Sequence, residues 1–197
     1  RLEFSPFFYL PQKMLLPNNK TRIDVSAHPF TTSMSNNDVR ITTNFSRKQP
    51  LFAFLSTVHE GGHALYELGM PKGIYKDTVI SDSPSLGLHE SQSRFWENMI
   101  AKNINFWKYF YPILKQTFPK QFRYINFDAW YFYLNQVRPS LIRIEADELT
   151  YCLHIILRFE LELDLLDEKI TVKELPEIWN DKMNELLGIT PKNDTDG

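Results

Sequence analysis

The stretch STVHEGGHALYELGM, residues 56–70, constrains this chain more than any other part of its sequence. It places His59 and His63 four residues apart, with Glu60 directly after the first histidine. The surrounding run, Pro50–Gly69, has the pattern of one helix, with a proline at its start and a glycine at its end. Residues four apart on a helix lie about 40° apart around the axis and one turn apart along it. The two histidines can therefore bind one metal ion from a single face of the helix.

The residue types in this motif point to zinc hydrolysis. Neutral imidazole nitrogens suit Zn²⁺, which binds them at about 2.0–2.1 Å. Glu60 projects beside the histidines and can reach a zinc-bound water without binding the metal itself. It would deprotonate that water, whose pKa zinc lowers towards about 7, and pass the proton to the leaving amine. The alternative is a chance match of the motif in an ordinary helix.

Two adjacent glycines, Gly61 and Gly62, occupy the middle of this predicted helix. Together they destabilise a helix by about 2 kcal/mol relative to alanine. We expect the close approach of another backbone or of a substrate to offset that loss.

A catalytic zinc ion needs a third protein ligand and one open position. The run GLHESQSRFWENM supplies His89, Glu90 and Glu97, in a second helix predicted from about Leu88 to Phe106 or beyond. Glu90 lies 27 residues after His63, across one loop, and is the preferred third ligand. We expect Glu97, on the same helix face, to orient a ligand histidine through its other ring nitrogen. The alternative for this face is a solvated surface with an Arg–Glu pair.

The remaining pattern predicts a mainly α fold with a small antiparallel β-sheet next to the helix that carries the two histidines. The alternating, β-branched run Asp38–Phe45 predicts a short strand. A helical stretch is predicted at FDAWYFYLNQV, a long helix from Ser140 through RFELELDLL, and a last helix from about Val172 to Leu187. We treat residues 1–197 as a single segment of one catalytic domain.

Charge and cysteine content narrow the range of partners. A net charge of -2 gives no reason to expect nucleic acid or an anionic membrane as partner. No apolar run is long enough to span a membrane. The single cysteine, Cys152, lies in LTYCLHIIL, which predicts a buried helical position. Because it cannot form an intrachain disulfide, it fits a reducing compartment, and we expect a cytoplasmic protein.

Five motifs resemble, in order along the chain, those of the carboxypeptidase Taq family of helical zinc metallocarboxypeptidases. They are SAHPFT (Ser26–Thr31), DVRIT (Asp38–Thr42) for D-x-R-x-T, HEGGH (His59–His63), HESQSR (His89–Arg94) and IRIEAD (Ile142–Asp147) for I-R-x-x-A-D. The resemblance implies a helical, zincin-like peptidase core with one Zn²⁺, or another divalent ion such as Co²⁺, on His59, His63 and Glu90. It also implies peptide substrates, from which single C-terminal residues are released with broad specificity.

Enzymes of that family are much longer than this chain and carry a further motif, G-x-x-Q-D-x-H-W. Gly197, the last residue here, is a candidate for the first glycine of that motif. The chain thus resembles the zinc-bearing middle of such an enzyme. Two alternatives remain open: an endo- or oligopeptidase with the same zinc site, and a truncated zinc-binding module without activity.

An exopeptidase of this kind must hold the free carboxylate of its substrate, which a planar guanidinium does best through two hydrogen bonds. Arg143, in IRIEAD, is the first candidate, and Arg40, in DVRIT, is the second. On the predicted long helix, a polar stripe at helical spacing either lines a cleft or faces water; it comprises Arg143, Asp147, Thr150, His154 and Arg158.

Two further segments are candidates for substrate contacts. DVRITTN is a candidate edge strand that would pair with an extended peptide, and a strand interior to a sheet is the alternative. His28, in SAHPF, is either a hydrogen-bond donor to substrate or a turn histidine without a role. We expect the aromatic runs FWKYFYPILKQTF and FDAWYFYLN to form core. Any part of them left exposed would favour a homodimer.

Overall fold

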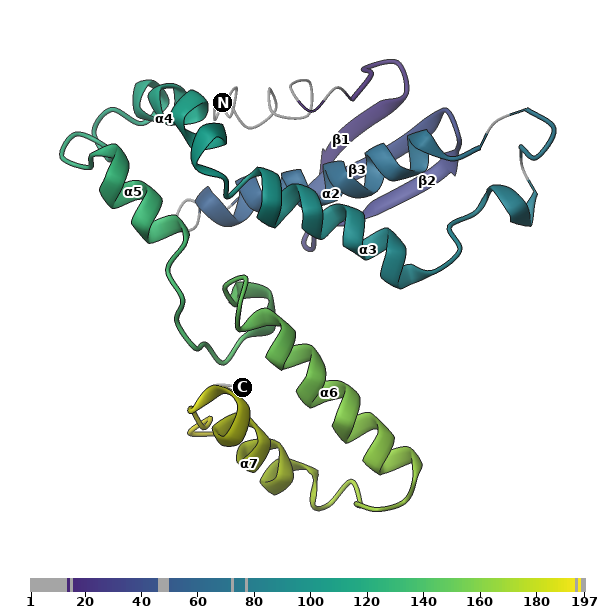
Figure 1. The fold of residues 1–197 in the computed structure, drawn as a ribbon, viewed down its shortest axis with the longest axis vertical. Helices are drawn as coiled ribbons and strands as arrows, with labels where there is room; N and C mark the ends of the chain where they lie inside the picture. The colour runs from purple at the N-terminus through teal and green to yellow at the C-terminus, as the bar shows by residue number, and fades with distance from the viewer. Residues whose placement is uncertain are drawn as a thin grey trace. The chain divides into compact units, whose positions relative to one another are not determined.

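The computed structural model describes residues 14, 16–45, 50–71, 73–76, 78–193 and 195. The chain divides into two compact units, Arg1–Tyr131 and Phe132–Gly197. Helices predominate and one small sheet lies in the first unit (Figure 1), so the predicted mainly α fold is confirmed. Across the described ranges, no helix is both long and apolar enough to cross a membrane. That the chain is one segment of a longer catalytic domain stays a prediction, and Gly197 lies outside the described residues.

The sheet has three strands in the order β1-β3-β2. Their bounds are β1 Thr21–Val25, β2 Thr31–Ser35 and β3 Asp38–Thr43. β3 pairs with β1 in parallel and with β2 in antiparallel fashion, so the sheet is mixed rather than wholly antiparallel. The strand predicted at DVRIT is confirmed, but the prediction that it lies at an edge is wrong. Its Val39 and Ile41 side chains are fully buried, which favours the central position, while the polar strand β2 takes an edge.

Helix α2 spans Pro50–Gly69, as the sequence predicts. It packs on strands β2 and β3 of the sheet (Figure 1). Val58 and Ala64 are buried on α2, and Thr57 donates a hydrogen bond of 3.0 Å to Thr43 of β3. The helix that carries the two histidines is therefore anchored to the sheet through apolar contacts and one buried hydroxyl pair.

The single helix predicted at residues 88–106 is wrong, because the structure divides this stretch. Asn103 interrupts it, and its side chain caps the next helix by accepting a 2.8 Å hydrogen bond from Asn105 N. The elements of this part are η1 Val79–Ser81, α3 Leu86–Arg94, the π-helical η2 Phe95–Ile100, α4 Ile104–Thr117 and α5 Phe127–Leu134. Trp107 of α4 is buried, with its ring 5.2 Å from Phe54 and 5.0 Å from Trp130. The predicted aromatic core is confirmed for Trp107 and Trp130, whereas other rings of the two aromatic runs, such as Tyr109, are exposed.

The second unit is a pair of helices, α6 Tyr151–Leu166 and α7 Leu175–Leu187, preceded by the short 3₁₀ turn η3 Arg143–Glu145. Its core consists of Leu157, Leu161, Met183 and Leu187. Helix α7 starts three residues later than the predicted Val172 and ends at Leu187 as predicted, and Gly188 follows it with a positive φ of 68° that closes the helix.

The long helix predicted from Ser140 is wrong, since α6 begins only at Tyr151. The reason is the carboxylate of Asp147, which accepts hydrogen bonds from the backbone N–H of Leu149 and Thr150 at 2.9 and 3.0 Å. These hydrogen bonds stabilise a turn at residues 148–150 ahead of α6, so the predicted polar stripe does not lie on one helix. Cys152, predicted to be buried, is exposed.

Candidate metal centre

Three side chains from two helices meet beside the sheet. His59 and His63 project from α2, and Glu90 projects from α3. The Glu90 Oε2 atom lies 3.2 Å from His63 Nε2 and 3.6 Å from His59 Nε2. One donor atom from each residue lies within 4.8 Å of the other two. Donors bound tetrahedrally to zinc at about 2.1 Å are roughly 3.4 Å apart, so these three groups fit such an ion.

Gly62 of α2 explains how α2 and α3 come so close. A Cβ atom on Gly62 would lie 2.7 Å from Ser93 Cα and 3.0 Å from Gln92 O, both in α3. The expected close approach of another backbone is therefore confirmed at Gly62. At Gly61 the neighbour is instead a side chain, with Met14 Sδ 2.9 Å from the position of a Cβ. Glycine at position 62 lets α3 lie against α2 so that Glu90 reaches the two histidines.

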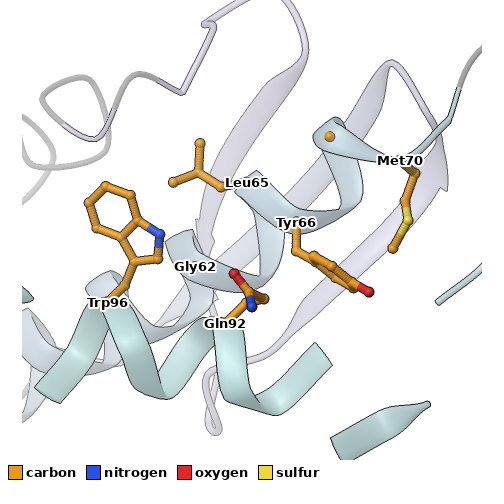
Figure 2. Close-up of a pocket in the computed structure, with 7 residues that line it drawn as sticks. Gly62, Leu65, Tyr66, Met70, Gln92 and Trp96 are labelled. Atoms are coloured by element: carbon orange, nitrogen blue, oxygen red, sulfur yellow. The ribbon is translucent and has the colours of Figure 1, made fainter. Parts of the chain in front are cut away.

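The same contact between the helices borders a shallow pocket (Figure 2). Figure 2 shows Gln92 and Trp96 approaching α2 beside Gly62. The pocket is lined by Gly62, Leu65, Tyr66, Gly69, Met70, Gln92 and Trp96. None of the three candidate ligands lines it, so the pocket and the metal centre are separate features.

Hydrogen bonds between the candidate ligands and Glu97 set the charges of this centre. Burial by itself lowers the pKa of His59, but hydrogen bonds to Glu90 and Glu97 outweigh burial and raise the pKa to about 9. Burial likewise raises the pKa of Glu90, and the hydrogen bonds from His59 and His63 outweigh it, so the pKa lies well below its ordinary value. A protonated His59 therefore places one positive charge between the carboxylates of Glu90 and Glu97. A metal ion that binds there must displace this proton.

Glu97 contacts His59 on the side of the ring that faces away from Glu90. Its Oε2 atom accepts hydrogen bonds from His59 Nδ1 at 2.9 Å and from Arg94 at 2.7 Å. Burial would raise the pKa of Glu97, but the His59 hydrogen bond and the Arg94 charge lower it instead. Glu97 stands on the π-helical turn η2, a rare geometry that is frequent at functional sites. The contact expected between Glu97 and a candidate ligand histidine is thus present, through the ring nitrogen that faces away from Glu90.

The second histidine has a different outer partner. His63 Nδ1 lies 2.6 Å from His89 Nδ1, and His89 Nε2 lies 2.6 Å from Glu67 Oε1. Glu67 follows His63 by four residues on the same face of α2, but it lies outside the motifs that pointed to the candidate ligands. Glu90 also has a partner, since Ser93 donates to its Oε2 atom at 3.2 Å.

The glutamate of the motif is set apart from the three donors. Glu60 is 7% exposed, and its Oε2 atom accepts a 2.6 Å hydrogen bond from the hydroxyl of Thr31 on β2. Thr31 ends the SAHPFT motif, but no role for its hydroxyl was predicted. Among the residues that the structure describes, the cluster of possible metal donors does not include Glu60, which leaves its carboxylate available as a base.

Each of the three predicted substrate-binding residues has a contact close to it in sequence. Arg40 is exposed on β3 and pairs with Asp38 at 2.9 Å. His28 is exposed, with Nδ1 2.6 Å from Pro29 O. Arg143 belongs to the second unit, where it donates a hydrogen bond to the Tyr151 hydroxyl and lies 5.3 Å from the centre of that ring. Their roles stay predictions.

Known metallopeptidases resemble this chain in sequence. The family model of the carboxypeptidase Taq (M32) metallopeptidases matches residues 13–197. Thermostable carboxypeptidase 1 of Pyrococcus furiosus is 48% identical over 190 residues, which are 96% of this chain and 38% of that protein. Carboxypeptidase 1 of Bacillus subtilis is 43% identical over 176 residues, 89% of this chain and 35% of that protein.

Solved structures agree with these sequence matches. A structure of the Pyrococcus furiosus carboxypeptidase superposes with a TM-score of 0.91 at 47% identity, over 96% of this chain and 38% of the other. The M32 carboxypeptidase of Deinococcus radiodurans gives a TM-score of 0.91 at 37% identity, over 98% and 40%. The chain therefore spans less than half the length of the relatives that it matches.

Proposed function

This chain belongs to the carboxypeptidase Taq (M32) metallopeptidase family, and we propose that it carries the zinc site of a metallocarboxypeptidase. Its substrates would be peptides, from which it releases C-terminal amino acids with broad specificity. Zn²⁺ is the proposed metal, one ion per chain, and Co²⁺ is an alternative with similar ligand preferences. A cytoplasmic location and a homodimer are part of this proposal, supported by the single cysteine and by exposed aromatic side chains such as Tyr109.

The observation that carries the proposal is the arrangement of the three donors. In both His59 and His63, Nε2 faces Glu90 and Nδ1 contacts a second partner, as is usual for metal-binding histidines. The second partner is Glu97 for His59 and His89 for His63. When bound, zinc would supply Lewis-acid chemistry that makes water a stronger acid. Glu60 would accept the proton of the attacking water and pass it to the leaving amine, while Thr31 holds the carboxylate in place.

Substrate binding is proposed for groups outside this cluster. Arg143 would hold the terminal carboxylate of the peptide, with Arg40 and His28 as further candidates. The edge strand nearest Glu60 is β2, which carries Thr31 and is mostly exposed, so β2 is the proposed partner for an extended peptide.

The test pairs a metal titration with peptide digestion. We expect the chain to bind zinc, and Glu60→Gln to keep it while kcat falls by roughly 10²–10⁴-fold, the range of a lost general base. Products are identified by mass spectrometry on peptides with free and with amidated C-termini. Release of single C-terminal residues from free peptides alone supports the proposal.

Other outcomes point to the alternatives. Cleavage inside both peptides would identify an endo- or oligopeptidase. Zinc binding without any turnover would identify a metal-binding module. Loss of zinc in Glu60→Gln would show that Glu60 is structural rather than a base.

A further inference from the structure

We propose that His89 and Glu67 act as a positioning relay that holds His63 in the one tautomer that can bind metal through Nε2. The inference rests on the proposed zinc site and assigns roles to two residues outside the ligand set. Neither residue belongs to the cluster of three donors, but together they account for the side of His63 that faces away from Glu90.

The tautomers follow from the two contacts once His63 binds metal. A neutral imidazole has one donor nitrogen and one acceptor nitrogen. If Nε2 of His63 gives its lone pair to a metal, Nδ1 must carry the hydrogen, and it points at His89 Nδ1 from 2.6 Å. His89 Nδ1 must then accept, so its hydrogen sits on Nε2, which donates to Glu67 Oε1 at 2.6 Å. Every hydrogen in the relay is determined by the carboxylate at one end and the metal at the other.

The same contacts exclude His89 as a ligand in this arrangement. Both of its ring nitrogens are engaged, one by His63 and one by Glu67. The ring also packs edge-on against Tyr66, with 5.0 Å between the ring centres, which limits its rotation. His89 is thus fixed by three neighbours on α2, although it belongs to α3.

Burial strengthens these hydrogen bonds. The side chains of His63, His89 and Glu67 are only 16%, 17% and 22% exposed, so water competes weakly for their polar atoms. The relay also joins α2 to α3 next to Glu90, the neighbour of His89 in sequence. It therefore orients His63 and fixes the distance between the two helices that supply the ligands.

Four variants of the full chain test the relay through zinc affinity, measured by competition with a chelator. His89→Leu should weaken zinc binding by roughly 10–100-fold, as expected when the group behind a metal-binding histidine is lost. Glu67→Leu should weaken it less, because His89 keeps its contact with His63. His89→Gln should recover part of the loss, since an amide offers an acceptor for His63 and a donor for Glu67. The exposed helical Glu185→Leu serves as a matched control and should leave the affinity unchanged.

The thermal midpoints of the metal-free variants separate positioning from folding. If His89→Leu binds zinc as tightly as the parent chain, the relay is wrong. If His89→Gln binds zinc as poorly as His89→Leu, and both melt well below the parent, the role of His89 is structural and the relay is again wrong.

Nitrogen-15 NMR of the zinc-loaded chain gives a second readout that does not depend on turnover. His89 should appear as a neutral ring with its hydrogen on Nε2, assigned by the signal that disappears in His89→Leu. A hydrogen on Nδ1, or on both nitrogens, would overturn the relay. A parent chain that binds zinc but releases no amino acid contradicts the proposed function alone, whereas one that binds no divalent ion contradicts both proposals.

Discussion

At the scale of single residues, the hydroxyl of Thr31 decides how the carboxylate of Glu60 is held. It donates to Glu60 Oε2 at 2.6 Å, and it also lies 3.1 Å from the backbone oxygen of the same residue. Glu60 is almost fully buried, so in another rotamer its carboxylate would be buried without the hydrogen bond from Thr31. Thr31 therefore ties strand β2 to the base of the proposed reaction.

Thr31→Val removes this hydroxyl and keeps the shape of the side chain. A hydrogen bond to a charged group contributes about 1.5–3 kcal/mol, so we expect kcat to fall by roughly 10- to 100-fold, with zinc content unchanged. Thr31→Ser keeps the hydroxyl and should retain most of the activity. Steady-state kinetics with a free peptide, together with elemental analysis, measures both quantities. Full activity in Thr31→Val together with a loss in Thr31→Ser would show that the methyl group, rather than the hydrogen bond, matters.

At the scale of elements, the contact of α2 with α3 sets the geometry of the metal centre. A side chain at Gly62 would meet the backbone of α3, which cannot move aside without carrying Glu90 with it. At Gly61 the obstacle is the end of the Met14 side chain, and at Gly69 nothing lies within 4 Å. Three glycines of one helix therefore differ in the neighbour that a methyl group would meet.

We expect Gly62→Ala to destabilise the fold by about 1–3 kcal/mol through overpacking and to weaken zinc binding as α3 moves away. Gly61→Ala should be tolerated, since a methionine adapts readily. Gly69→Ala is the matched control and should raise the free energy of unfolding by up to about 1 kcal/mol through helix propensity. Denaturant unfolding and zinc titration of the three variants rank them by stability and by zinc affinity. A Gly62→Ala chain as stable as Gly69→Ala would contradict the role given to the helix contact.

The elements that the sequence predicted well are those whose ends are marked locally. Helix α2 was predicted to the residue because Pro50 and Gly69 bound an apolar stripe. The starts of α4 and α6 are not predicted by the sequence pattern. The side chain of Asn103 caps α4 and that of Asp147 holds the turn before α6, but both residue types also fit inside a helical pattern. The candidate ligand set lies in two motifs of fixed spacing and could be predicted. The contacts of His89 with His63 and Glu67 could not be predicted, since they depend on how α2 and α3 pack.

Asp147 makes the start of α6 depend on pH. Its Oδ1 atom accepts from Leu149 N and Thr150 N, and its Oδ2 atom accepts from Arg138 N at 2.9 Å and from the Thr150 hydroxyl at 2.8 Å. Burial alone would raise the pKa of Asp147, but these hydrogen bonds lower it. A lowered pKa means that the stabilisation is fully present above the ordinary value of about 3.8 and is lost as the pH falls through the lowered value.

Asp147→Asn keeps an acceptor at Oδ1 but not at Oδ2, and we expect it to cost about 0.5–2 kcal/mol, as the loss of a helix cap does. The difference in stability between this variant and the parent chain should be constant near neutral pH and should shrink below about pH 4. Hydrogen exchange of the first turn of α6 measures it across pH. Asp181→Asn, an exposed aspartate of α7, is the control. A stability difference between Asp147→Asn and the parent chain that grows as the pH falls would contradict the role of the Asp147 charge.

At the scale of the whole molecule, the proposed functions are divided between the two units. The candidate metal ligands and the base lie in Arg1–Tyr131, whereas Arg143, the proposed carboxylate-binding residue, lies in Phe132–Gly197. The guanidinium of Arg143 donates a hydrogen bond to the hydroxyl of Tyr151 and lies over that ring, 5.3 Å from its centre. Arg143 therefore tests whether the second unit takes part in recognition.

We expect Arg143→Ala to weaken kcat/KM for a peptide with a free C-terminus by about 2–4 kcal/mol, because a charge-assisted contact made through two hydrogen bonds is lost. The amidated peptide offers no carboxylate, so its slow cleavage should hardly change. Arg143→Lys should recover only part of the loss, since an ammonium lacks the planar pair of donors. Arg123→Ala is a matched control, because Arg123 also lies over a tyrosine ring, 5.1 Å from the centre of Tyr124. If Arg143→Ala impairs both peptides equally, its guanidinium stabilises the fold of the second unit, and recognition of the terminal carboxylate belongs to another residue.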